Sequence, residues 1–336
     1  MTGQTLSMLE IEALSRAALK GSGAVGIQLE QGTCAIVDAE ADGIRTVGLG
    51  YLPVYCEQLR VGKIRGDVVP SHTQVAGATI ASDARQGFSF AAFHEAVDDF
   101  HSLAMQQGVA ALAIQNSTSA GVLGWFVERT AKAGLVGMGF ANSGALMAPY
   151  GGKTAFFGTN PLAFAVPRAN GKPPLIADLA TSQVAYVTVA KHAAEGKKIP
   201  LGWGLDKNGQ PTTDPNDVLD GGSMAPMGGY KGTLLALLVD VLAGGLAGPN
   251  FAFQASSLGN NEGGPPDVGQ MFLALSPGTF NGQSAFGPRL EVMLQALTAD
   301  DGVRLPGDSR YRNREKATDK GIPVPADLIA RIESYA

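Results

Sequence analysis

The chain has 336 residues, of which 45% are hydrophobic and 16% charged, a composition that suits a large buried core and excludes disorder as its main state. The net charge of −5, with scattered basic residues, gives no electrostatic case for binding nucleic acid. Two cysteines, Cys34 and Cys56, form no disulfide framework and no CxxC motif. Reduced thiols and a cytoplasmic protein are therefore expected, and no secretory signal is predicted.

The first elements in chain order are two predicted amphipathic helices, at 8–20 and 24–42, with an irregular segment following at 43–72. The string GSGAVG, residues 21–26, matches the GxGxxG pattern of dinucleotide-binding proteins. That pattern needs a strand before it and a helix after it. Because GSGAVG follows a helical segment instead, it is interpreted as a helix–helix turn.

The rest of the chain alternates between helices and strands without a regular βαβ rhythm. Helices are predicted at 90–107, 121–133, 183–195, 231–243 and 288–299, and strands at 109–114, 135–141, 163–166, 175–177 and 271–275. The apolar stretch 233–248 is interrupted by Asp240 and is interpreted as a buried core helix, too short for a membrane span. The pattern predicts an α/β fold of the mixed α+β kind rather than a doubly wound sheet.

Three strings in the middle of the chain are specific: FFGTNPLAFAVPR (156–168), ADLATS (177–182) with IPLGWGLDKNGQPTTDP (199–215) beyond it, and GGYKG (228–232). Together they resemble the malate/L-lactate dehydrogenase-type oxidoreductases, from about residue 8 to residue 325, and most of all the Δ1-piperideine-2-carboxylate/Δ1-pyrroline-2-carboxylate reductases. The resemblance implies a non-Rossmann fold with a large, mostly antiparallel sheet and a helical domain. It also implies a homodimer. Residues 1–75 with 286–336 would form the helical, substrate-side domain, and 76–285 the NAD(P)-binding and dimerisation core.

The same strings suggest a cofactor site. By the resemblance, Thr159 contacts substrate, and the cofactor is held by Ser119, Ala120, Gly121, Asn160, Asp178, Leu179, Ala180, Ser182, Gly229, Lys231, Arg310 and Arg312. Asp178 suits ribose hydroxyls, while Thr181 and Ser182 suit either a helix cap near Gln183 or a phosphate. Lys231 is unfavourable at a helix N-terminus unless an anion compensates it. Arg310 and Arg312 form either a solvated face or a 2′-phosphate site, which favours NADPH while leaving NADH possible.

The chain departs from the family at its catalytic string, Ser-His-Gly with an arginine four residues after the histidine. Thr46 stands at the serine's place, Val47 at the histidine's and Tyr51 at the arginine's. In the second motif, NSTSAG, Ser119 stands where the family has histidine. The four histidines, His72, His94, His101 and His192, lie in no signature string.

Reduction of a ketone needs a general acid at the oxygen, a role that valine cannot fill. A cyclic imine can arrive already protonated, so hydride transfer then needs positioning and charge stabilisation. The leading hypothesis is NAD(P)H-dependent reduction of a cyclic imino acid, Δ1-pyrroline-2-carboxylate or Δ1-piperideine-2-carboxylate. Thr46, Ser119 and Tyr51 would act at the reacting centre, and Arg45 would hold the carboxylate. The alternatives are a 2-hydroxy-acid dehydrogenase and a catalytically degenerate nucleotide-binding protein; no metal, nucleic acid or membrane partner is expected.

Overall fold

A large mixed sheet forms the centre of the structure, which is a computed structural model describing residues 3–281 and 283–336. Its seven strands run in the order β2-β3-β4-β11-β5-β6-β7. They are β2 (Ser71–Ala76), β3 (Thr79–Asp83), β4 (Val109–Ser117), β11 (Val268–Leu275), β5 (Val136–Ala141), β6 (Leu162–Val166) and β7 (Leu175–Leu179). Only β3 and β4 pair in parallel. The predicted large, mostly antiparallel sheet is confirmed, whereas β2 and β3 were not predicted.

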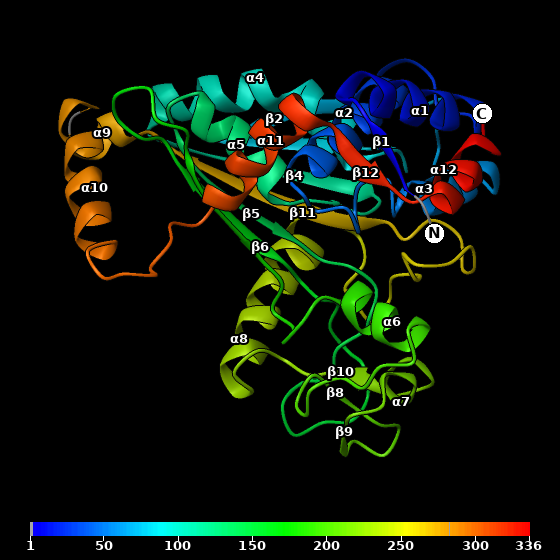
Figure 1. Cartoon of the computed structure of the whole chain (residues 1–336). Coiled ribbons are helices and arrows are strands. Elements are labelled where there is room, and N and C mark those ends of the chain that lie inside the picture. Colours follow the sequence, from blue (N-terminus) through cyan, green and yellow to red (C-terminus); the bar gives the residue numbers. More distant parts are fainter. Residues whose placement is uncertain (1–2, 282) are drawn as a thin grey trace.

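Both faces of the sheet are covered by other parts of the chain. Successive side chains of a strand point to opposite faces, so one strand contributes to both of the layers that pack on the sheet. In β11, Phe272 belongs to the main core and Met271 to a second cluster on the other face. Helices α4 (Ser89–Gln107) and α5 (Gly124–Lys132) cover the first face, and the π-helix η1 (Asp240–Ala247) lies against the second, while α8 (Tyr230–Val239), which precedes η1, runs down away from the sheet (Figure 1). The strands beside the centre are therefore apolar on both sides.

The helical layer over the first face is completed from both ends of the chain. It contains α1 (Met8–Gly21), α2 (Gly26–Ala41), α3 (Leu52–Arg60), α11 (Asp308–Lys320) and α12 (Ala326–Glu333), with the short pair β1 (Gln4–Leu6) and β12 (Ile322–Val324) (Figure 1). GSGAVG joins α1 to α2, so the helix–helix turn is confirmed. A Cβ at Gly21 would clash with the carbonyl oxygen of Tyr335, which explains the glycine at this close approach.

A smaller lobe lies below the sheet (Figure 1). It contains α6 (Tyr186–Ala194), α7 (Pro215–Leu219) and the small sheet of β8 (Gly204–Leu205), β9 (Pro211–Thr212) and β10 (Ser223–Met224). Its own core includes Met147, Phe157 and Met224. At one end of the large sheet, α9 (Pro277–Asn281) and α10 (Gln283–Leu297) are held by Arg168, which donates from Nε to Glu291 at 2.8 Å.

Five helices among the described residues lie outside the predicted ranges, namely α3, α7, α9, α11 and α12. For α3, α11 and α12 the physical reason differs. α3 begins with Pro53 in its first turn, where proline is tolerated, although the proline suggested a loop. α11 has the sequence DSRYRNREKATDK and no apolar stripe, so its stability depends on tertiary ion pairs. α12 is only eight residues long and follows a proline-punctuated segment.

The helix formed by α8 and η1 is only partly the buried core helix that was predicted. It is 18 residues long, enough by length and composition to span a membrane, and 39% of it is buried in the protein. The η1 half packs on β11, whereas Leu234, Leu237 and Leu238 in the α8 half are 45%, 46% and 47% exposed. Packing on the sheet fits a soluble protein and leaves one apolar side without a described partner.

Candidate functional site

The three motifs that are distant in sequence meet at the start of α8. The carbonyl of Thr159 accepts hydrogen bonds from the Thr181 N–H at 2.9 Å and from the Thr181 hydroxyl at 3.0 Å. The Thr181 carbonyl accepts from Met227 N–H at 2.9 Å, and Asn160 Nδ2 donates to the carbonyl of Ala236 at 2.9 Å. The structure thus brings GTNP, ADLATS and the segment before GGYKG together as one wall, to which Leu179 and Ala180 also belong.

Polar groups remain free along this wall. Asn160 is fully buried with a φ of 35°, and its Oδ1 has no hydrogen-bond partner among the described residues. Gly228 and Gly229 have φ values of 59° and 63°, a conformation that favours glycine. Lys231 is exposed in the first turn of α8 and makes no ion pair with any residue that the structure describes. Lys231 and the glycine-rich start of α8 can receive an anion, whereas the Asn160 Oδ1 can only accept a hydrogen bond.

The sequence analysis assigned Thr181 and Ser182 as possible helix caps, and the structure corrects this. α6 begins at Tyr186, with Ala185 at its N-cap and no side-chain cap. Ser182 instead donates from its hydroxyl to the carbonyl of Val184 at 2.7 Å. Ser182 also forms an antiparallel β-bridge with Pro226. Thr181 and Ser182 therefore connect the three motifs and do not cap the helix.

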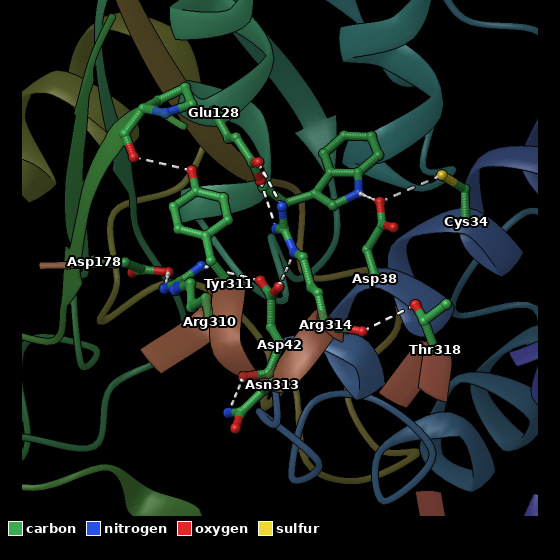
Figure 2. Close-up of polar contacts among 12 residues, drawn as sticks. Cys34, Asp38, Asp42, Glu128, Asp178, Arg310, Tyr311, Asn313, Arg314 and Thr318 are labelled. Atoms are coloured by element: carbon green, nitrogen blue, oxygen red, sulfur yellow. Dashed lines mark hydrogen bonds and ion pairs between the residues drawn. The ribbon is translucent and has the colours of Figure 1, made fainter. Parts of the chain in front are cut away.

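Asp178, at the end of β7, joins the wall to the helical layer. Its Oδ2 accepts from the Gly124 N–H at 2.8 Å. It also accepts from Arg310 NH2 at 3.0 Å, while Arg310 NH1 lies 3.5 Å from Asp42 Oδ2 (Figure 2). Gly124 starts α5, directly after the loop that carries Ser119, Ala120 and Gly121. Arg310 is therefore occupied by carboxylates, and one oxygen of Asp178 remains for a ligand.

Arg312 points elsewhere on the same helix. It lines a surface pocket of about 420 Å³ at the N-terminus of α11, together with Arg304 and Ser309. Gly307 caps this helix with a φ of 94°. Two exposed arginines at a helix N-terminus suit a phosphate group. Sequence reasoning missed Arg304, since it stands outside the alternating arginines.

The loop after α2 carries the residues expected to replace the family's catalytic string. Thr46 and Arg45 are exposed, whereas Val47 packs against the main core. The loop is held by Glu40, whose Oε1 accepts from Leu49 N–H at 2.6 Å, and by Arg45 NH1, which donates to the Pro323 carbonyl at 3.2 Å. Val47, predicted to stand at the histidine's place, is thus a packing residue in this structure.

Tyr55 contacts Tyr51 on one side and lies near the loop of Ser119 and Gly121 on the other. The rings of Tyr51 and Tyr55 lie edge to face at 4.8 Å, and a Cβ at Gly121 would be 3.5 Å from the Tyr55 hydroxyl. The Tyr51 hydroxyl donates to the Leu258 carbonyl, and the Ser119 hydroxyl accepts from Gly121 N–H at 3.1 Å. Burial raises the pKa of Tyr51 above its ordinary value, so this phenol holds its proton and is a weak acid. No sequence signal singled out Tyr55.

None of the four histidines forms a hydrogen bond with Thr46 or Ser119 among the described residues. His72 is 2.9 Å from Asp99, His101 is 3.0 Å from the Thr130 hydroxyl, and His192 bonds to the Thr188 carbonyl. His94 is exposed on α4. Burial lowers the pKa of His101 to about 4, consistent with a satisfied neutral imidazole. None of them replaces the histidine that the catalytic string lacks.

Comparison with known proteins places this geometry in context. The sequence profile described as malate/L-lactate dehydrogenase matches residues 6–333. The chain is 42% identical to a (2R)-3-sulfolactate dehydrogenase (NADP(+)) of Chromohalobacter salexigens, covering 98% of both chains. It is 37% identical to a Δ1-pyrroline-2-carboxylate/Δ1-piperideine-2-carboxylate reductase of Pseudomonas syringae pv. tomato, covering 89% of this chain and 86% of that one. The crystal structure of Δ1-piperideine-2-carboxylate reductase from the same organism superposes with a TM-score of 0.93 at 34% identity, covering 99% of this chain and 100% of that one.

Proposed function

Since this chain belongs to the malate/L-lactate dehydrogenase family of NAD(P)-dependent oxidoreductases, we propose that it reduces a cyclic imino acid, Δ1-pyrroline-2-carboxylate or Δ1-piperideine-2-carboxylate, to L-proline or L-pipecolate. The observation that carries the proposal is Val47, which is partly buried against the core and is predicted to stand at the place of the family's acid–base histidine. An iminium substrate brings its own proton, so its reduction tolerates that loss.

A second candidate is oxidation of a 2-hydroxy acid, favoured by the 42% identity to a sulfolactate dehydrogenase. This reaction needs a base for the alcohol proton, and Tyr51, the phenol at the place of the family's arginine, is held protonated by burial. A water held by Thr46 would have to take its place. A nucleotide-binding protein without turnover is the third possibility.

Absorbance of NADPH, followed with purified protein, separates these functions. We expect rapid oxidation with freshly prepared Δ1-pyrroline-2-carboxylate or Δ1-piperideine-2-carboxylate and little with pyruvate or oxaloacetate. Reduction of NADP⁺ by (2R)-3-sulfolactate, without imine reduction, would establish the second candidate. Binding of NADPH without turnover of any of these compounds would establish the third.

The proposed cofactor is NADPH, and the residues present fit it. Asp178, Asn160, Ser182 and the exposed Lys231 offer ribose and phosphate partners along the wall described above, with Thr159 facing the substrate. Bound there, the reduced nicotinamide supplies the hydride. Because Arg310 is paired inward, Arg312 and Arg304 are the groups proposed for the 2′-phosphate.

Replacing Arg312 by glutamate tests this assignment. We expect the KM for NADPH to rise about tenfold or more, because one charge-assisted hydrogen bond is lost and a repulsion gained, while the KM for NADH changes little. Lys316→Glu, on an exposed position of the same helix, is the control. Equal effects of Arg312→Glu on both cofactors would contradict the proposed 2′-phosphate site.

We also propose a cytoplasmic homodimer. Cys34 and Cys56 are both free, as suits a reducing compartment. The exposed side of α8 and η1, which carries Leu234, Leu237, Leu238, Val241 and Leu246, supports a dimer interface, because apolar patches of this kind mark association surfaces.

Leu238→Asp is therefore expected to convert the dimer to a monomer at micromolar concentration in analytical ultracentrifugation. A carboxylate buried in an apolar interface is left without a partner there. Leu201→Asp, 68% exposed in the lower lobe, should leave the mass unchanged. A monomeric wild-type protein would contradict the proposed dimer.

A further inference from the structure

Tyr150 lies in the loop that precedes the GTNP motif. Met147 and Phe157 form an antiparallel β-bridge, in which the Met147 N–H donates to the Phe157 carbonyl at 2.8 Å and the Phe157 N–H donates to the Met147 carbonyl at 3.1 Å. Residues 148–156 therefore form a closed loop, and Tyr150 lies in a turn of it. Because GTNP begins at Gly158, this loop is anchored beside the proposed cofactor wall.

The backbone and the ring of Tyr150 both contact the first turn of α8. The Tyr150 N–H donates to the Thr233 hydroxyl at 2.9 Å. A Cβ at Gly229, the N-cap of α8, would lie 3.1 Å from Cδ2 and 3.2 Å from Cε2 of the ring. One side of the ring therefore covers Gly229, where the missing side chain leaves room for this contact.

The remainder of the Tyr150 ring is open, since the residue is 67% exposed. It pairs with no aromatic ring among the residues that the structure describes, whereas the exposed ring of Phe156 stacks on Phe253 at 5.0 Å. Lys231, in the first turn of α8, is exposed as well, and a Cβ at Gly228 would have no heavy atom within 4 Å. The start of α8 thus presents an open aromatic ring, a cation and open space within one turn of helix.

We propose that Tyr150 is a stacking residue of the cofactor site, on which one flat ring of the dinucleotide lies while Lys231 pairs with the phosphate of the same nucleotide. Nicotinamide and adenine are both flat rings that stack on a tyrosine. This assignment rests on the proposed function, because it takes the wall from Thr159 to Lys231 as the place of the cofactor.

The chemistry of a nucleotide matches this pair of groups. One ribose separates the ring of a nucleotide from its 5′-phosphate, so an aromatic surface and a cation in neighbouring positions can bind both ends of one unit. The Tyr150 backbone is fixed by Thr233, and its ring is supported by Gly229. Little side-chain freedom is therefore lost when a ligand ring lies on it. Tyr150 transfers no proton and is a binding residue only.

Titration of NADPH into wild-type protein, Tyr150→Ala and Tyr150→Phe by calorimetry tests the assignment. We expect Tyr150→Ala to weaken NADPH about tenfold, because the stacking surface is lost. Tyr150→Phe keeps the ring and should restore the affinity to within about threefold of wild type. Phe280→Ala, which removes a ring that is 64% exposed on α9, is the control and should bind NADPH as wild type does.

The two halves of the cofactor identify the ring that stacks. Weaker binding of nicotinamide mononucleotide alone to Tyr150→Ala assigns the nicotinamide, and weaker binding of adenosine 2′,5′-bisphosphate alone assigns the adenine. Unchanged binding of both halves and of NADPH would overturn the assignment. An equal loss in Tyr150→Ala and Tyr150→Phe would also overturn it, because the hydroxyl and not the ring would then be responsible. A lower mass of Tyr150→Ala in ultracentrifugation, with unchanged NADPH affinity, would place Tyr150 in an association surface instead.

The same variants separate this assignment from the proposed function. If wild-type protein reduces the imines while Tyr150→Ala binds NADPH equally well, the stacking role fails and the proposed function stands. If no imine is reduced but NADPH affinity still depends on the ring of Tyr150, the proposed function fails and the stacking role stands.

Discussion

Arg314→Ala should lower the free energy of unfolding by about 3–5 kcal/mol, the range for breaking a buried ion pair by removing one partner. Arg314 donates from Nε to Asp42 Oδ1 at 2.5 Å and from NH1 and NH2 to the two oxygens of Glu128 at 2.6 Å each (Figure 2). The side chains of Asp42 and Glu128 are each only 3% exposed. Without the guanidinium, two carboxylates face each other in the interior with little compensation.

Urea unfolding at neutral pH measures this effect, with Arg312→Ala on the same helix as the control, because Arg312 is exposed and forms no ion pair with a described residue. Burial opposes ionisation of Glu128, but Arg314 and Lys132 together lower its pKa below 4.5. Its stabilisation is therefore present above pH 4.5 and is lost as the pH falls through the lowered value. The gap between wild type and Arg314→Ala should narrow on acidification; a gap below about 1 kcal/mol at neutral pH would contradict the ion-pair role.

The network also matters for function, because it joins the two halves of the proposed site. Asp42 begins the loop that carries Thr46, and Glu128 lies in α5, which follows Ser119 and Gly121. Arg314 fixes both to α11, and Arg310 fixes Asp178 to the same helix. We expect a variant that is destabilised here to lose cofactor affinity together with stability.

Lys63→Met should lower the free energy of unfolding by about 2–4 kcal/mol and open the loop at 257–262. The Lys63 ammonium is 2% exposed and donates to the carbonyls of Ser257 at 2.7 Å, Asn260 at 3.1 Å and Glu262 at 2.5 Å. Methionine fills most of the same space but leaves these carbonyls without their donor. The loop also accepts the Tyr51 hydroxyl at Leu258, so its opening should free that phenol.

Hydrogen exchange of residues 257–262 and limited proteolysis measure the opening. Lys198→Met, an exposed lysine near α6, is the matched control and should behave as wild type. If Lys63→Met leaves exchange and cleavage of this loop unchanged, Lys63 does not hold it, and the contacts of Tyr51 and Gln58 must be sufficient.

The local patterns in the sequence were enough for the family, most of the sheet and the main helices. β4, β5 and β11 are short apolar runs, and the stripe of α4 contains Phe93 and Phe100, both fully buried. GSGAVG was correctly separated from a dinucleotide fingerprint because a helix precedes it. These features depend on neighbours in sequence, which hydrophobic period and turn residues record directly.

The sequence did not reveal which charged side chains pair with each other, because these ion pairs join segments that are distant in the chain. Arg310 and Arg312 look alike in the chain, but the turn of α11 aims one at Asp178 and the other at a surface pocket. Glu40 lies in an ordinary helical pattern, and only the packing of the β12–α12 segment encloses it beside Arg45. The sequence by itself determined the family and the mixed sheet, and it predicts that Val47 stands at the place of the family's histidine. Only the tertiary structure decided which charges are paired and which remain free for a ligand, because burial and pairing arise between segments that are distant in sequence.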